Sequence, residues 1–181
     1  MTDAVLVTES WKAVMAAFSM HQVGELFYNT LFEQCPSMAE TLFKGVDMKS
    51  QSTKLIEMID AAIQLLGKPD DLVPVLIGLG ERHAGYGVTA EHYPVVAKAL
   101  ITTLQKGLGA AMTPEVTTAW VNIYGVIQGA MLKGSDSPKG QALARARAAR
   151  LAQTEGTPVV VKVAVLVGVL AVAAFAAKKL L

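Results

Sequence analysis

The sequence predicts an all-α fold over residues 1–133. No apolar–polar alternation of strand length occurs there, which argues against a sheet. Glycine and proline breakers divide the region into seven segments of helical length. In several segments apolar residues recur at intervals of three and four, the spacing of one helix face. An all-helical domain of this length buries a single substantial core.

The predicted helices follow from the breakers in chain order. Their ranges are 4–18, 20–34, 36–43, 49–66, 71–84, 90–107 and 114–132. The breakers between them include Cys35–Pro36, Gly45, Gly67–Lys68–Pro69, Gly85–Tyr86–Gly87, Tyr93–Pro94, Gly107, Gly109 and Pro114. The last helix has a clear start, since Thr113 can cap it, Pro114 suits its first position and Glu115 lies in its first turn.

The composition of the 181 residues excludes several classes of protein. A net charge of +1 lacks the strong basic excess of a nucleic-acid binder. At 52% hydrophobic and 17% charged residues, the chain is too apolar to be disordered. The single cysteine, Cys35, excludes an internal disulfide framework and any cysteine-rich zinc or iron–sulfur site. We expect a reducing compartment.

The charges are unevenly distributed. Residues 1–133 carry 9 basic and 13 acidic residues, residues 134–157 carry 4 and 2, and residues 158–181 carry 3 and 0. The first range therefore predicts a globular domain. The second becomes an Ala/Arg helix pattern with few large apolar side chains, so it predicts a solvated basic linker without a core to join.

The third range predicts a C-terminal transmembrane tail anchor over 158–181. Nineteen residues from Val159 to Ala177 contain one charge, Lys162. As a helix they span roughly 28 Å, close to the hydrocarbon thickness of a bilayer. The basic residues before the segment outnumber the two after it, which favours a domain facing the cytoplasm. The alternative is an apolar helix buried in an oligomer, and a homodimer through the tail is a related expectation.

Three polar side chains lie on predicted apolar faces. His83 follows Leu72, Leu76 and Leu79 at helical spacing, and Tyr28 and Gln51 occupy similar positions in the second and fourth helices. If buried, each needs a hydrogen-bond or ligand partner. Taken singly, His83 is also typical of a satisfied core histidine, Gln51 of a capping residue and Tyr28 of a core residue with its hydroxyl at the rim.

Several longer motifs carry a family resemblance. They are Thr8-Glu9-Ser10-Trp11, Leu26-Phe27-Tyr28-x-x-Leu31-Phe32, Leu42-Phe43, Ser50-Gln51-Ser52-x-Lys54-Leu55, Leu79-Gly80-x-Arg82-His83-x-x-Tyr86-Gly87-Val88, His92-Tyr93-Pro94-Val95-Val96 and Ala119-Trp120-x-x-x-Tyr124-Gly125. In this order they resemble the globins, specifically single-domain bacterial globins of the flavohaemoglobin lineage, with a more distant likeness to neuroglobin. The resemblance covers residues 4–132 and does not extend to the linker or tail.

The resemblance implies a globin fold, with about seven helices around a pocket for haem b, iron protoporphyrin IX. It implies that His83 is the metal ligand. The other haem contacts that it implies are Phe43, Lys54, Tyr86, Val88 and Tyr93, and the distal, ligand-binding residues are Tyr28, Gln51 and Leu55. From the residue alone, Lys54 is equally typical of a solvated lysine.

These residues predict reversible binding of O₂, NO and CO at a five-coordinate iron, with Tyr28 and Gln51 as hydrogen-bond donors. The expected roles are O₂ supply or nitric-oxide detoxification at a membrane. Nitric-oxide dioxygenase activity would need a separate reductase as electron donor, because the 48 residues after position 133 are too few for a flavin and nicotinamide domain. A membrane-tethered haem gas sensor or redox-relay protein is the alternative.

One departure from the flavohaemoglobins concerns the proximal side. Those proteins use a tyrosine, which Tyr93 resembles, and a glutamate of the last helix to strengthen electron donation through the histidine. The glutamate is expected near Ser135, and no glutamate occurs between Trp120 and Gln153. We therefore expect weak peroxidase-like chemistry.

Overall fold

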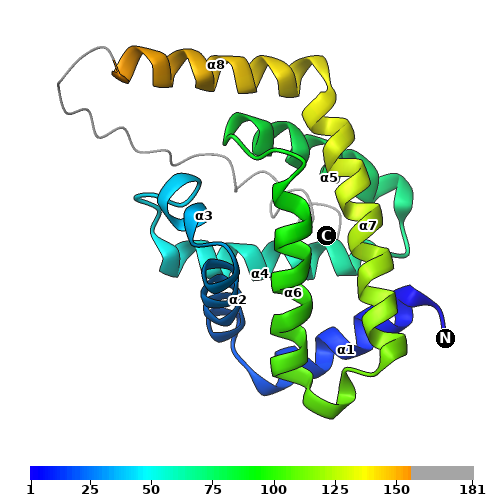
Figure 1. The fold of residues 1–181 in the computed structure, drawn as a ribbon. Helices are drawn as coiled ribbons and strands as arrows, with labels where there is room; N and C mark the ends of the chain where they lie inside the picture. The colour runs from blue at the N-terminus through cyan, green and yellow to red at the C-terminus, as the bar shows by residue number, and fades with distance from the viewer. Residues whose placement is uncertain (156–181) are drawn as a thin grey trace. The chain divides into compact units, whose positions relative to one another are not determined.

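The computed structural model describes residues 1–155, and the tail predicted over 158–181 lies outside them. The helices are α1 (Asp3–Ala17), α2 (Met20–Gln34), α3 (Pro36–Thr41), α4 (Met48–Gln64), α5 (Pro69–Gly85), α6 (His92–Leu108), a short 3₁₀ helix η1 (Gly109–Ala111), α7 (Pro114–Asp136) and α8 (Pro138–Glu155) (Figure 1). No strand occurs in this part of the chain, so the all-α prediction is confirmed there. Among the described helices, none has the length and apolar character needed to cross a membrane.

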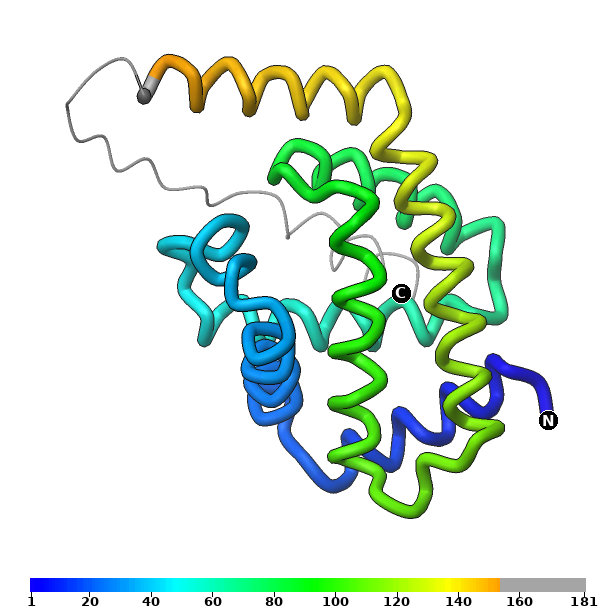
Figure 2. The backbone as a smooth tube through the Cα atoms, in the orientation of Figure 1, coloured from blue at the N-terminus to red at the C-terminus, as the bar shows by residue number. Residues whose placement is uncertain are grey.

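The first compact unit comprises Met1–Leu72 and Thr89–Gly129. Within it, α2 packs against both α4 and α6, and Figure 2 shows α2 nearly end-on beside the upright α6. Ser19 begins α2 with a capping box, since its side chain accepts from the Gln22 amide and the Gln22 side chain accepts from the Ser19 amide. Asp47 caps α4 by accepting from the Lys49 and Ser50 amides. These caps fix where α2 and α4 begin, and these are the helices that carry Tyr28 and Gln51.

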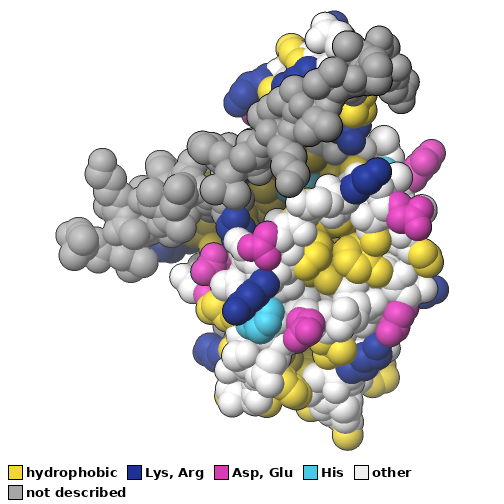
Figure 3. Space-filling view, turned by 90° about the vertical axis from the view of Figure 1, so that its left-hand side faces the viewer, with side chains coloured by type: hydrophobic (Ala, Val, Ile, Leu, Met, Phe, Trp, Pro, Cys, Tyr) yellow, Lys and Arg dark blue, Asp and Glu magenta, His cyan; other side chains and the backbone are white. Residues whose placement is uncertain are grey.

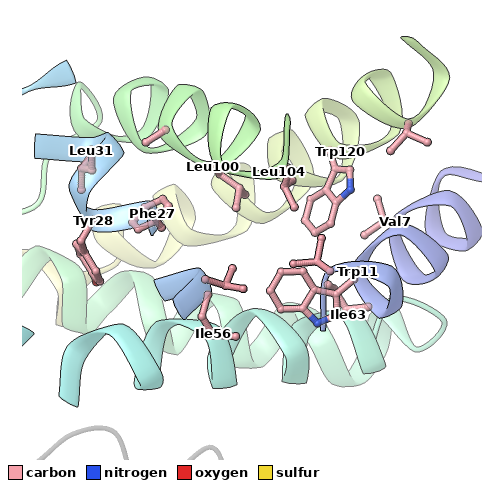
Figure 4. Packing of buried hydrophobic residues seen from close by; sticks show 14 of the residues in the cluster. Val7, Trp11, Phe27, Tyr28, Leu31, Ile56, Ile63, Leu100, Leu104 and Trp120 are labelled. Carbon is pink, nitrogen blue, oxygen red and sulfur yellow. The ribbon is translucent and has the colours of Figure 1, made fainter. Parts of the chain in front are cut away.

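The core of this unit contains two indoles side by side (Figure 4). The ring centroids of Trp11 and Trp120 lie 6.0 Å apart. Each indole N–H has an acceptor, because Trp11 donates to Asp60 and Trp120 donates to Ser10, both at 2.9 Å. Burying the rings removes a large apolar area from water without leaving a polar atom unpaired.

Gly24 sets how closely α2 approaches α4. A Cβ at this position would overlap the backbone carbonyl of Ser52. The glycine therefore permits backbone-to-backbone contact at the crossing, in a helix interior where glycine is otherwise unfavourable. The crossing lies one turn of α2 before Tyr28 and one residue of α4 after Gln51.

The second unit comprises Val73–Val88 and the chain from Ala130 onward. Here too glycines stand at the contacts: a Cβ at Gly80 would overlap the Met131 carbonyl, and a Cβ at Gly134 would overlap the Ile77 carbonyl. The Ser135 hydroxyl donates to the Gly80 carbonyl at 3.2 Å. The end of α7 thus lies directly against α5.

The described part of the predicted linker differs from a fully solvated segment. Gly140 is buried, and Leu143 lies against Gly85. Lys139 forms an ion pair with Glu81 at 2.6 Å. The prediction was based on the scarcity of large apolar residues, but glycine-mediated contacts need no such residues.

The surface carries both signs of charge. On the face drawn in Figure 3, acidic and basic side chains are interspersed around hydrophobic patches. The uncovered part of this face therefore carries both signs of charge, in keeping with the net charge of +1 of the whole chain.

The α2–α4 crossing generates a stability prediction. Gly24→Ala should lower the free energy of unfolding by about 1–3 kcal/mol, because the new methyl group overlaps backbone that cannot move easily. The matched control is Gly125→Ala in α7, where a Cβ would meet nothing within 4 Å. That change should raise the free energy of unfolding by up to about 1 kcal/mol through helix propensity. Urea unfolding followed by circular dichroism measures both, and equal effects would contradict the crossing.

Candidate functional site

Tyr28 and Gln51 meet across the α2–α4 crossing. The Gln51 side-chain amide donates to the Tyr28 hydroxyl oxygen at 3.1 Å. Tyr28 is only 5% exposed, and Gln51 is half-buried. The pair therefore joins two of the three polar side chains that the sequence places on apolar faces.

Aromatic side chains surround the Tyr28 ring. Its centroid lies 5.1 Å from that of Phe27, 5.8 Å from that of Phe32 and 5.2 Å from that of Phe43. The Phe27 and Phe43 contacts are edge-to-face, the geometry that aromatic quadrupoles favour. Phe43 was predicted as a haem contact, and the structure brings it to Tyr28. The roles of Phe27 and Phe32 beside Tyr28 were not predicted, although Phe32 lies one helical turn after it.

Burial raises the pKa of Tyr28 to about 12, and the hydrogen bond from Gln51 offsets part of this rise. The hydroxyl therefore keeps its proton at neutral pH. Since the amide already donates to the Tyr28 oxygen, the phenolic proton is available to another acceptor. Tyr28 and Gln51 are therefore two uncharged hydrogen-bond donors that lie beside a cluster of phenylalanine rings.

His83 lies in the last turns of α5. Its Nδ1 atom is 2.9 Å from the Leu79 carbonyl, which only accepts, so this nitrogen donates and the lone pair of the neutral ring lies on Nε2. Burial lowers the pKa of His83, with a smaller lowering from the nearby Arg82 guanidinium and an opposing rise from the Leu79 hydrogen bond. A neutral imidazole with a free Nε2 is suited to bind a metal ion.

The turn after His83 brings together two further predicted residues. The Tyr86 ring centroid lies 5.9 Å from that of His83, and Tyr86 is 43% exposed. The Val88 amide donates to the His83 carbonyl at 3.0 Å. Gly87 between them has a φ of +85°, a left-handed conformation that favours glycine.

The remaining predicted residues are Lys54 and Leu55 on α4 and Tyr93 on α6. Leu55 and Lys54 are half-buried on α4, and Leu55 packs against the hydrophobic core. Tyr93 is buried in α6, and its carbonyl accepts from the Tyr124 hydroxyl at 2.8 Å. Desolvation raises the pKa of Tyr124, so it is a hydroxyl donor at neutral pH.

Metal-ligating side chains do not cluster in the described part of the chain. Within residues 1–155, no group of three or more His, Cys, Asp or Glu side chains is placed to hold one. A surface hollow of about 650 Å³ is lined by Met1, Asp3, Leu6 and the start of α7, and it includes none of the predicted site residues. A single neutral imidazole fits a metal whose other ligands come from a cofactor, as in haem.

Comparisons with known proteins indicate one family. Residues 26–131 match the model of the family described as Globin. The flavohemoprotein of Bacillus subtilis (strain 168) is 32% identical over 108 residues, which cover 59% of this chain and 27% of that protein. The neuroglobin of Danio rerio is 28% identical over 145 residues, which cover 73% of this chain and 89% of the relative. The chain thus spans less than a third of the first flavohemoprotein's length.

Two solved structures share the fold. A hexacoordinated heme protein from an anhydrobiotic tardigrade aligns with a TM-score of 0.65 at 19% identity, covering 75% of this chain and 94% of that one. A flavohemoglobin from Malassezia yamatoensis with bound FAD and heme aligns with a TM-score of 0.60 at 21% identity, covering 81% and 37%. The predicted globin fold is confirmed.

The environment of His83 generates a pH prediction. In the folded chain its pKa lies below the ordinary value of 6.5, so in the window just below pH 6.5 the unfolded state binds more protons. Lowering the pH through that window should therefore reduce the free energy of unfolding. The His83→Gln variant should lose less stability between pH 7.5 and 5.5, measured by urea unfolding. Identical pH dependence in the two proteins would contradict the burial of a neutral ring.

Proposed function

Because this chain belongs to the globin family, we propose that it reversibly binds O₂, NO and CO at a five-coordinate haem iron. His83 is the metal ligand, and Tyr28 and Gln51 are the distal donors. The observation that carries the proposal is the hydrogen bond between Gln51 and Tyr28, which holds two neutral donors together at an aromatic surface.

Haem b is the cofactor. The relatives and structural neighbours of this chain include flavohemoproteins and heme proteins. When bound, haem would supply an iron able to bind a diatomic ligand. His83 would hold it through Nε2, with the ring orientation set by the Leu79 carbonyl. The lowered pKa of His83 keeps that nitrogen unprotonated at neutral pH.

The distal residues discriminate between ligands by hydrogen bonding. Tyr28 and Gln51 donate to the outer atom of a diatomic ligand that accepts hydrogen bonds well, as O₂ does, and less to CO. Each bond in a dry site contributes on the order of 1–3 kcal/mol. Phe43 and Leu55 would exclude water from a bound diatomic ligand, and Lys54 would bind a haem carboxylate.

Two physiological roles follow from ligand binding, namely O₂ supply and nitric-oxide detoxification with an external reductase. The likeness to flavohemoproteins supports the second role. We expect His83 to donate electrons only modestly to a bound haem iron, because its Nδ1 donates its proton to a backbone carbonyl and not to a carboxylate. Ser135 lies near the position where the flavohaemoglobin resemblance leads us to expect a glutamate.

The second candidate is a haem gas sensor or redox relay. The favouring observation is the contact of α8 with α5, the helix that carries His83: Leu143 lies against Gly85, and Lys139 pairs with Glu81. A change at His83 could be passed to α8 through these contacts. Capture of a specific partner by residues 134–157, together with fast O₂ release, would favour this candidate.

The role of His83 is tested by its removal and chemical replacement. His83→Gly should abolish the Soret spectrum of a histidine-ligated haem, and added imidazole should restore it by filling the space of the lost ring. Absorption spectra of the ferric, reduced and CO-bound forms give the readout. An unchanged spectrum in the variant would exclude His83 as the ligand.

The distal donors are tested by ligand release. Tyr28→Phe should speed O₂ dissociation by about 5- to 150-fold, since a bond of 1–3 kcal/mol is lost. CO dissociation should change far less, which makes it an internal control. Stopped-flow or flash-photolysis measurements give both rates. Equal O₂ dissociation rates in the two proteins would remove Tyr28 from its proposed role.

We further propose that the protein is held at a membrane by residues 158–181, with its globin domain facing the cytoplasm. The sequence supports this, since the segment from Val159 to Ala177 carries one charge. Deleting residues 158–181 should move the protein from the membrane fraction to the soluble fraction while leaving its haem spectrum unchanged. Full-length protein found soluble and monomeric would overturn the anchor.

A further inference from the structure

Helix α8 lies outside the family match, which ends at residue 131, yet it contacts the helix that carries His83. The contacts advance along both helices together. Lys139 pairs with Glu81, and Leu143 lies against Gly85. Farther along, Arg147 lies against Gly87. The helix therefore follows the last turns of α5 into the turn after His83.

The guanidinium of Arg147 lies unusually close to that turn. A Cβ built on Gly87 would lie 2.6 Å from both Cζ and Nη1 of Arg147, so the guanidinium in this position occupies the space that a side chain would take. The positive φ of Gly87 also favours glycine. The guanidinium of Arg147 thus lies directly against the backbone of the turn at Gly87.

No anionic partner for this cation is recorded in the described chain. Arg147 is half-buried, and within residues 1–155 it forms no ion pair and no side-chain hydrogen bond. Glu81, the acidic residue of this part of α5, is already paired with Lys139. By contrast, Arg145 on the same helix is exposed and donates to Gln141. A half-buried guanidinium without a counter-charge fits a carboxylate ligand, which it can bind through two N–H groups.

We propose that Arg147 of α8 binds a carboxylate of the haem at the turn that follows His83. This rests on the proposed haem function and adds a residue from outside the globin match to the cofactor site. The chain then holds the cofactor at two points of one unit, the iron through His83 and a propionate through Arg147. Helix α8 would thereby slow the loss of haem.

The test measures haem transfer to excess apomyoglobin from the full-length protein. Arg147→Gln should release haem roughly tenfold faster, as expected for the loss of a charge-assisted hydrogen bond. Arg145→Gln is the matched control, and it should release haem at the wild-type rate. Arg147→Lys keeps the positive charge but lacks the two parallel N–H donors of the guanidinium, so it should release haem at an intermediate rate.

A second arm identifies the carboxylate. Each protein is loaded with haem dimethyl ester, whose propionates carry no charge. Wild type and Arg147→Gln should then release it at equal rates. If the variant still releases the ester faster, Arg147 acts by supporting the turn and the proposal is wrong. Equal release of ordinary haem by Arg147→Gln and Arg145→Gln would also overturn it. Failure of the wild-type protein to take up haem would instead overturn the proposed function itself, and this proposal with it.

Discussion

The backbone contact between α2 and α4 at Gly24 and Ser52 is the constraint on which the distal site depends. Because a side chain at Gly24 would overlap the Ser52 carbonyl, the helices meet at a distance that only glycine allows. Tyr28 lies one turn beyond the crossing on α2, and Gln51 precedes Ser52 on α4. The same approach that packs the helices therefore brings the amide within 3.1 Å of the phenol. A wider crossing would leave both polar groups buried without each other.

The second unit uses the same device for a different purpose. Gly80 and Gly134 let the end of α7 lie directly against α5, and Gly140 lets the start of α8 lie close to the end of α7. Leu143 of α8 lies against Gly85 of α5. These contacts surround the segment that holds His83, whose Nδ1 is in turn fixed by the Leu79 carbonyl. The hydrogen bond to the Leu79 carbonyl fixes the orientation of the His83 ring, and the close contacts with α7 and α8 fix the position of α5. Together they leave Nε2 as the free nitrogen.

The sequence predicted more of the helices than of their contacts. Local signals sufficed for α7, where Thr113, Pro114 and Glu115 mark the start. The spacing of Tyr28 and Gln51 indicated inward faces, but periodicity does not say which faces meet, so their pairing came from the family resemblance. The packing of residues 134–147 was missed for a related reason. Contacts made by Gly134 and Gly140 leave no apolar stripe to detect.

Burial holds two of the proposed site residues, Tyr28 and His83, in their neutral forms. It raises the pKa of Tyr28 to about 12 and lowers the pKa of His83. Gln51 does not ionise at all. At neutral pH His83 is therefore a neutral base within the second unit, and Tyr28 and Gln51 are neutral donors within the first. Charged groups would favour anionic or cationic ligands, whereas neutral donors in an aromatic setting suit a small uncharged molecule such as O₂.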